Sequence, residues 1–380
     1  ASHPAFIFSI YWFLILAVAK IFSGPQLNVD AAAIYIFAAV LAFTTPAIFF
    51  KKKDIEAENH MVNRSPLMYV VFVVLQALIT IGIILHVQAQ GFSVFAALCA
   101  PDKFGGDFIG LRYSGKIIST VYIQIATSIN FACAAMCGLM VANDRRYALP
   151  ALLTIFAFFP SIIMMFLFGD KGTLPQSIAF YCGGLFVGWI SLGNPTIMTK
   201  RAAVFFFIGF CFIVPTIVIA MIIKVVGKFQ VPNAMIVDYL QYYFRSYVVG
   251  SIYAFSDWLN WYAGQQSIVT YTEQNIDKGM FTFWGIAKYF PTGLHMPNGY
   301  YLEYFEVPEI VQTNIYTAFR GLIMDFGLLG SLTFLSIIGW ISSKAYQLII
   351  NKYFAPLSQV FYIMLIGAIY ASSLISLCTW

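Results

Sequence analysis

Three basic residues lie where apolar segments meet polar connections, and they are the first candidates for chemistry. Arg320 lies in "NIYTAFRGLIMDFG", Arg245 in "DYLQYYFRSY" and Lys171 in "FLFGDKGTLPQS". A cation near lipid is costly unless it meets water or an anion, and arginine can grip a phosphate through two parallel hydrogen bonds. Together with Arg112, these residues predict a cationic pocket for a diphosphate at the membrane surface. For each one alone, snorkelling towards lipid head groups is the competing interpretation.

Two carboxylates and one histidine are candidates for handling a proton or orienting a cation. Asp325 follows Arg320 by five residues and is predicted to orient it, or to form another local ion pair. Asp257, in "AFSDWLNWY", and His295, in "FPTGLHMPNGYY", are alternative general bases. An unperturbed imidazole, with a pKa of about 6.5, suits proton abstraction. A solvated turn histidine is the competing interpretation of His295.

The segment around these residues is rich in aromatic rings, with runs such as "WLNWY" and "YYLEYF". Tyrosine and tryptophan rings can stack on the apolar faces of sugars, so Trp258 is a candidate sugar-binding residue. The acids among the rings, such as Glu303 and Glu306, are candidates for contacting hydroxyl groups. An interfacial belt of Tyr and Trp is the alternative explanation of the rings.

The composition indicates which elements must position these side chains. Hydrophobic residues make up 61% of the 380 residues and charged residues only 10%, against about 25% charged in ordinary soluble domains. This composition excludes a soluble enzyme. The apolar segments are continuous over about 20 residues, the length with which a helix crosses about 30 Å of hydrocarbon, and they lack the alternation of barrel strands. The predicted fold is an all-α, polytopic helical membrane protein.

Nine spans are predicted, at about 5–22, 31–50, 67–88, 117–141, 148–168, 173–192, 202–223, 316–341 and 354–378. If they alternate, one side holds the short-loop residues Lys51, Lys52, Lys53, Arg64, Arg145, Arg146, Lys200, Arg201, Lys344 and Lys352. The other side holds Lys20, Lys103, Arg112, Lys116 and Lys171. Lysine and arginine are enriched in cytoplasmic loops, so the first side is predicted to face the cytoplasm.

Three parts follow from this plan: N-terminal transmembrane helices in 1–223, a large non-cytoplasmic loop in 224–315, and C-terminal transmembrane helices in 316–380. Within the loop, the apolar stretch 235–255 is interrupted by Asp238 and Arg245, which predicts an interfacial or re-entrant helix instead of a tenth span. No nucleotide-binding, zinc-protease or Asp-x-Asp motif is found, so a reaction without metal or cofactor is expected.

Residues 314–332, "NIYTAFRGLIMDFGLLGSL", resemble the Asn-x-Tyr-Thr-x-x-Arg segment and following Asp-Phe-Gly of bacterial oligosaccharide repeat-unit polymerases, the O-antigen and capsule polymerase (Wzy) family. The stretch "YYFRSYVVGSIYAFSDWL" at 242–259 resembles that family's long-loop segment. The Gly-x-Lys-Gly turn at 169–172 is similar to its Gly-x-Arg-Gly turn, with Lys171 at the arginine position. The hydropathy plan is similar over nearly the whole chain.

The resemblance implies a GT-C-like bundle with one large periplasmic loop, in a multi-pass protein of the bacterial inner membrane. It implies a glycosyltransferase that polymerises undecaprenyl-diphosphate-linked oligosaccharide units at the periplasmic face. Arg320, Arg245 and Lys171 would stabilise charge on the leaving diphosphate. Asn314 and Tyr316, as motif residues, are expected to bind substrate.

Two other classes remain as alternatives. An O-antigen ligase would share the diphosphate chemistry and transfer finished glycan to another acceptor. A lipid-linked oligosaccharide flippase or a solute transporter would break no bond. Besides the substrate and membrane lipid, a chain-length regulator and a flippase are expected partners, and nucleic acid is not.

Overall fold

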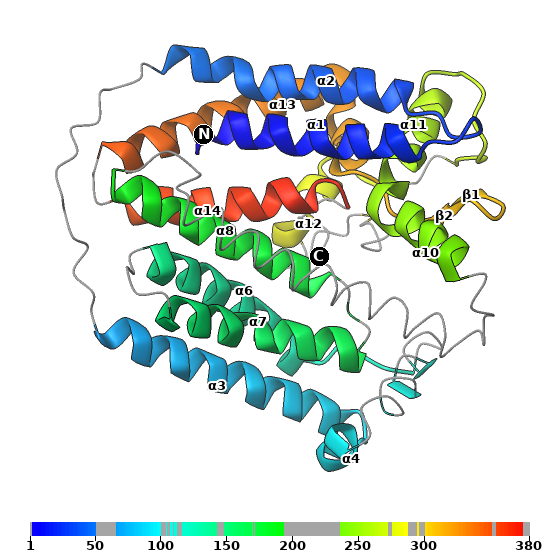
Figure 1. Cartoon of the computed structure of the whole chain (residues 1–380). Coiled ribbons are helices and arrows are strands. Elements are labelled where there is room, and N and C mark those ends of the chain that lie inside the picture. The colour runs from blue at the N-terminus through cyan, green and yellow to red at the C-terminus, as the bar shows by residue number, and fades with distance from the viewer. Residues whose placement is uncertain are drawn as a thin grey trace.

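The computed structural model describes residues 2–50, 66–99, 104, 107, 108, 110, 111, 116–142, 148–168, 170, 172–193, 236–272, 276–287, 295, 301–351 and 355–374. Long helices run side by side through most of this part of the chain, and shorter elements gather at one end of them (Figure 1). The fold is therefore all-α apart from one small hairpin.

The bundle consists of eight long helices in the described part of the chain. They are α1 (Pro4–Phe22), α2 (Asp30–Thr44) with the 3-10 turn η1 (Thr45–Phe49), α3 (Pro66–Ala89), α6 (Val121–Ala142), α7 (Ala148–Phe168), α8 (Thr173–Ser191), α13 (Ala318–Ile350) and α14 (Pro356–Ala371). Six are long and apolar enough to cross a membrane, namely α1, α2 with η1, α3, α6, α7 and α13. The predicted span at 202–223 lies outside the described residues.

Large apolar side chains point outward from these helices. Phe13 is 72% exposed, Ile34 74% and Ile155 65%. Such surfaces are unfavourable in water and suit lipid tails. The apolar exteriors, like the helix lengths, fit a multi-pass membrane protein.

Close packing and buried hydrogen bonds join α6, α7 and α8. Gly138 on α6 and Gly184 on α8 lie so close to the facing helix backbone that a Cβ on either would overlap it. Small residues of this kind allow membrane helices to approach. Asn130 Nδ2 donates to Ser161 Oγ (2.8 Å) and Ser177 Oγ (2.9 Å), so polar groups also connect the three helices.

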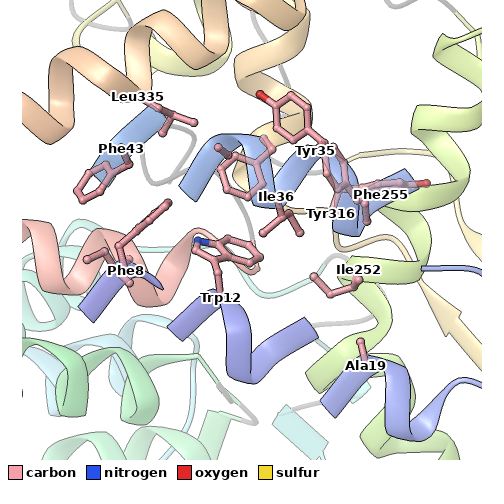
Figure 2. Packing of buried hydrophobic residues seen from close by; sticks show 14 of the residues in the cluster. Phe8, Trp12, Ala19, Tyr35, Ile36, Phe43, Ile252, Phe255, Tyr316 and Leu335 are labelled. Carbon is pink, nitrogen blue, oxygen red and sulfur yellow. The ribbon is translucent and has the colours of Figure 1, made fainter. Parts of the chain in front are cut away.

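A second set of contacts joins α1, α2 and α13 to the shorter elements. Trp12, Phe8 and Phe43 pack in the same cluster as Phe255 and Tyr316, which come from the far end of the bundle (Figure 2). The cluster extends from the interior of the helical bundle to the region that carries the candidate residues. It therefore fixes that region to the bundle.

The shorter elements are α4 (Val94–Cys99), α10 (Ile236–Phe244), the π-helix η3 (Arg245–Val249), α11 (Gly250–Tyr262), α12 (Met280–Ala287) and an antiparallel hairpin of β1 (Phe305–Val307) and β2 (Val311–Thr313). The stretch predicted as an interfacial or re-entrant helix forms α10, η3 and the start of α11, and it is not among the six candidate spans. The hairpin was not predicted. Its strands have only three residues each, and Glu309 in its turn adopts a positive φ of 62°.

Helix α13 is interrupted at Gly327, whose φ of 71° and ψ of 177° are not helical. Its 33 residues would extend about 50 Å at about 1.5 Å per residue, well beyond about 30 Å of hydrocarbon. Residues 328–350 after the break suffice to cross, and the segment before it carries Arg320 and Asp325. The predicted span 316–341 falls in this helix, which continues to Ile350.

Candidate functional site

Arg320 is enclosed by four aromatic rings. Its guanidinium carbon lies 3.9 Å from the ring centre of Tyr301 and 4.2 Å from that of Tyr316. The rings of Trp258 and Tyr271 are each 5.4 Å away. These distances are within cation–π range, and the side chain is only 1% exposed. We call these five residues the arginine cage.

Glu303 supplies the negative charge that Arg320 needs. Arg320 Nη2 donates to Glu303 Oε1 over 3.3 Å, and the Glu303 side chain is 12% exposed. Arg320 Nε and Nη1 have no hydrogen-bond partner among the described residues. A buried cation with one carboxylate depends strongly on that carboxylate and on the rings around it.

The phenols of the cage stay neutral. Burial raises the pKa of Tyr316 to about 12, although the positive charge of Arg320 acts in the opposite direction. Burial also raises the pKa of Tyr271 above the usual phenol value. The rings therefore offer neutral faces to the cation at any physiological pH.

Asp325 does not orient Arg320, contrary to the prediction. Its Oδ1 accepts hydrogen bonds from the backbone N–H groups of Gly279 (3.0 Å) and Phe281 (3.2 Å). Its Oδ2 accepts from Thr282 N (2.7 Å) and Thr282 Oγ1 (2.6 Å). These donors lie at the start of α12, where free N–H groups and the helix dipole favour an anion. Asp325 therefore attaches α12 to α13. Glu303 is the carboxylate that pairs with Arg320, the role predicted for Asp325.

Asp257 is likewise occupied by hydrogen bonds. Its two oxygens accept from Ile268 N (2.7 Å), Val269 N (3.1 Å) and the Tyr271 hydroxyl (3.0 Å). The carboxylate holds the loop after α11 and one ring of the arginine cage. Its position thus argues for a structural role over the predicted one of general base.

His295 contacts Asp277 and is not one of the residues that form the arginine cage. Its Nδ1 is 3.5 Å from Asp277 Oδ2, its backbone N donates to the same oxygen (2.7 Å), and its side chain is 67% exposed. The ring is thus accessible.

Arg245 is an accessible cation of this region. It begins the π-helix η3, a feature frequent at functional sites, and it is half-buried. Among the described residues, no carboxylate lies within 4.0 Å of its guanidinium, whose Nε is buried without a hydrogen-bond partner. Its charge acts on the phenol of Tyr253, two turns further along the chain.

The remaining predicted residues divide into two groups. Trp258 and Tyr316 belong to the arginine cage, and Asn314 Nδ2 donates to the backbone oxygen of Tyr301 in that cage (3.3 Å). Lys171 and Arg112 lie outside the described residues. Sequence reasoning missed Tyr271 and Tyr301. The only signal for Tyr301 was its place in the run "YYLEYF" beside Glu303.

A polar cavity of 290 Å³ lies beside the cage. Its wall is formed by Gln26, Asn28, Tyr253, Asp257, Asn260, Gln266, Ser267, Ile268 and Phe305. These residues belong to the α1–α2 connection, α11, the loop after α11 and β1. Asp257 connects the two features, because it lines the cavity and bonds to Tyr271 of the cage.

The described residues contain no cluster of three His, Cys, Asp or Glu side chains placed to hold a metal ion. The fold and the site define a multi-pass helical membrane protein with a buried arginine cage and a polar cavity at one end. No protein-family model, curated protein or solved structure matches the chain.

Proposed function

We propose that the protein is a membrane glycosyltransferase that polymerises undecaprenyl-diphosphate-linked oligosaccharide units into O-antigen or capsular polysaccharide, with a GT-C-like fold and its site on the periplasmic side of the inner membrane. One observation carries the proposal. Tyr316 and Arg320, from the segment that resembles the polymerases, pack with Trp258 and Tyr271 from the long loop, beside a polar cavity.

In the proposed reaction, the bond between the anomeric carbon of the growing glycan and its diphosphate oxygen breaks. A hydroxyl oxygen of the incoming lipid-linked unit forms the new bond to that carbon. The hydroxyl proton passes to a base, and the carrier diphosphate leaves with the electron pair. A fixed cation near the leaving oxygen lowers the barrier, because negative charge develops there.

Arg245 takes the direct contact with the diphosphate in this proposal. It is half-exposed and has no carboxylate partner among the described residues, whereas Arg320 is almost fully buried and is paired with Glu303. Arg320 is therefore a positioning residue that holds the long loop against α13. Of the two candidate bases, His295 keeps an accessible ring, and the oxygens of Asp257 are occupied.

The test is polymerisation by the purified protein in lipid nanodiscs, with lipid-linked repeat units as substrate and the glycan ladder as readout. The wild type is expected to lengthen the glycan. Arg245→Ala is expected to lower the rate at least about 100-fold, in line with the loss of one stabilising group for the developing charge. Lys344→Ala, an exposed cation in the second half of α13, is the matched control and should leave the rate unchanged.

Each contrary outcome is specific. Transfer of a whole glycan to a lipid A core without lengthening would indicate a ligase. Movement of the lipid-linked unit across the membrane without a new bond would indicate a flippase. Normal ladders from Arg245→Ala at equal protein levels would remove the assigned role of that arginine.

A further inference from the structure

The polar cavity offers side-chain amide groups that form no hydrogen bond with the described part of the chain. The side chains of Gln26, Asn260 and Gln266 line it and make no hydrogen bond to another described residue. Gln26 comes from the α1–α2 connection, and the other two come from α11 and the loop after it. Three unpaired amides that converge on one hollow provide both donors and acceptors for a ligand.

The described part of the cavity lining carries no positive charge. The described residues that line it include no lysine, arginine or histidine, and Asp257 is the one carboxylate among them. Both oxygens of Asp257 already accept hydrogen bonds from the protein. The cavity can therefore pair with hydroxyl groups, and its described lining offers no cation to balance the charge of a carboxylate or phosphate.

The walls are held in place before any ligand arrives. Leu27 and Val29, on either side of Asn28, are buried and anchor the α1–α2 connection. Asp257 fixes the loop after α11 through the backbone N–H groups of Ile268 and Val269. Because the backbone of the walls is fixed in this way, the main chain loses little conformational freedom on binding, and the ligand orders only side chains such as Gln26 and Gln266.

From these observations we infer that the cavity is a binding subsite for one uncharged, hydroxyl-rich sugar residue. Its 290 Å³ lies just below the usual range of ligand clefts, about 300–1,000 Å³, which fits a single ring better than an oligosaccharide. Ile268 in the lining, 56% exposed, supplies an apolar contact for the sugar. The assignment of this sugar to the glycan substrate rests on the proposed function.

Saturation-transfer NMR on the full-length protein in nanodiscs tests the subsite. The probes are the neutral trisaccharides maltotriose, mannotriose, galactotriose and triacetylchitotriose, and the acidic trigalacturonate. At least one neutral probe is expected to receive saturation, and trigalacturonate is expected to receive less. The double variant Asn260→Leu/Gln266→Leu should lower the affinity for that neutral probe about tenfold, because two hydrogen bonds of about 0.5–1.5 kcal/mol each are lost.

Gln265→Leu is the matched control, because Gln265 is an exposed neighbour of Gln266 that does not line the cavity. It should bind the probe like the wild type. The inference is overturned if no neutral probe binds, if the double variant binds unchanged, or if trigalacturonate binds more strongly.

The polymerisation assay separates this inference from the proposed function. Sugar binding that depends on Asn260 and Gln266, without glycan lengthening, would support the subsite and contradict the polymerase. Glycan lengthening that the double variant leaves unchanged would support the polymerase and contradict the subsite.

Discussion

The pairing of Arg320 with Glu303 concentrates the stability of the site in two side chains. Arg320 is 1% exposed and Glu303 is 12% exposed, so removal of the carboxylate leaves a buried cation without a counter-charge. Glu303→Gln is expected to lower the free energy of unfolding by about 3–5 kcal/mol, the usual cost of breaking a buried pair from one side. Unfolding in detergent, followed by circular dichroism, measures this change.

Glu306→Gln is the control for that experiment. Glu306 is exposed and accepts a hydrogen bond from Gln312 Nε2 over 3.3 Å, so its replacement should change stability by less than about 0.5 kcal/mol. Equal stability of the Glu303 and Glu306 variants would show that the ion pair does not hold the cage.

The rings of the cage can be tested one at a time. Tyr301→Phe keeps a ring face 3.9 Å from the guanidinium and should retain most of the stability. Tyr301→Ala removes both the cation–π contact and the buried ring, which predicts a loss of about 3–5 kcal/mol. Thermal unfolding of the two variants compares them directly. A phenylalanine variant as unstable as the alanine variant would contradict the importance of the ring face.

At the scale of elements, one carboxylate holds α12 against α13. Asp325→Asn replaces one accepting oxygen by an NH₂ group that faces N–H donors of the α12 start. The expected loss is about 1.5–3 kcal/mol, the contribution of hydrogen bonds to a charged group. Hydrogen exchange of residues 280–287 should become faster. Asp30→Asn in the first turn of α2, an exposed acid, should leave that exchange unchanged.

The break in α13 depends on a backbone conformation that glycine adopts and other residues avoid. Gly327→Ala has open space for its Cβ, so its whole effect comes from the φ of 71° and ψ of 177°. A cost of about 1–3 kcal/mol is expected. Gly24→Ala also has open space and a normal φ, and its stability should match that of the wild type. Unfolding midpoints of the two variants decide the point.

The helices were predictable from the sequence because lipid imposes both their length and their composition. The apolar segments at 5–22 and 148–168 correspond to α1 and α7 almost residue for residue. The contacts of the site were not predictable in the same way. Glu303 reaches Arg320 only because the β1–β2 hairpin turns the chain back, and strands of three residues leave no clear periodic pattern.

The cavity could not be predicted from the sequence, for a related reason. Gln26 and Asn260 lie more than 200 positions apart in the chain, and no local pattern signals that they meet. The rings of the cage come from α11, the loop after it and the segments on either side of the hairpin. The sequence therefore identified the aromatic-rich loop as a unit, but it did not identify which residue each ring contacts.

At the scale of the whole molecule, the charge bias of the loops predicts that the end with α10, α11 and the hairpin faces outward (Figure 1). In a cysteine-free background, Gln265→Cys is expected to react with an impermeant maleimide in cells with a permeabilised outer membrane. Lys344→Cys should react only after lysis, because it lies in the half of α13 beyond the break. The reverse labelling pattern would invert the topology.

Polar contacts join α1 to helices that are synthesised hundreds of residues later. The Tyr11 hydroxyl donates to the backbone oxygen of Tyr370 in α14 (2.8 Å), and Ser2 Oγ, just before α1, lies 3.2 Å from the Tyr346 hydroxyl in α13. During biogenesis, the first span must therefore wait in the bilayer with an unsatisfied phenol until α14 has left the ribosome. Quality-control proteases that sense exposed polar groups in lipid would therefore act mainly on the nascent chain, before α14 is inserted.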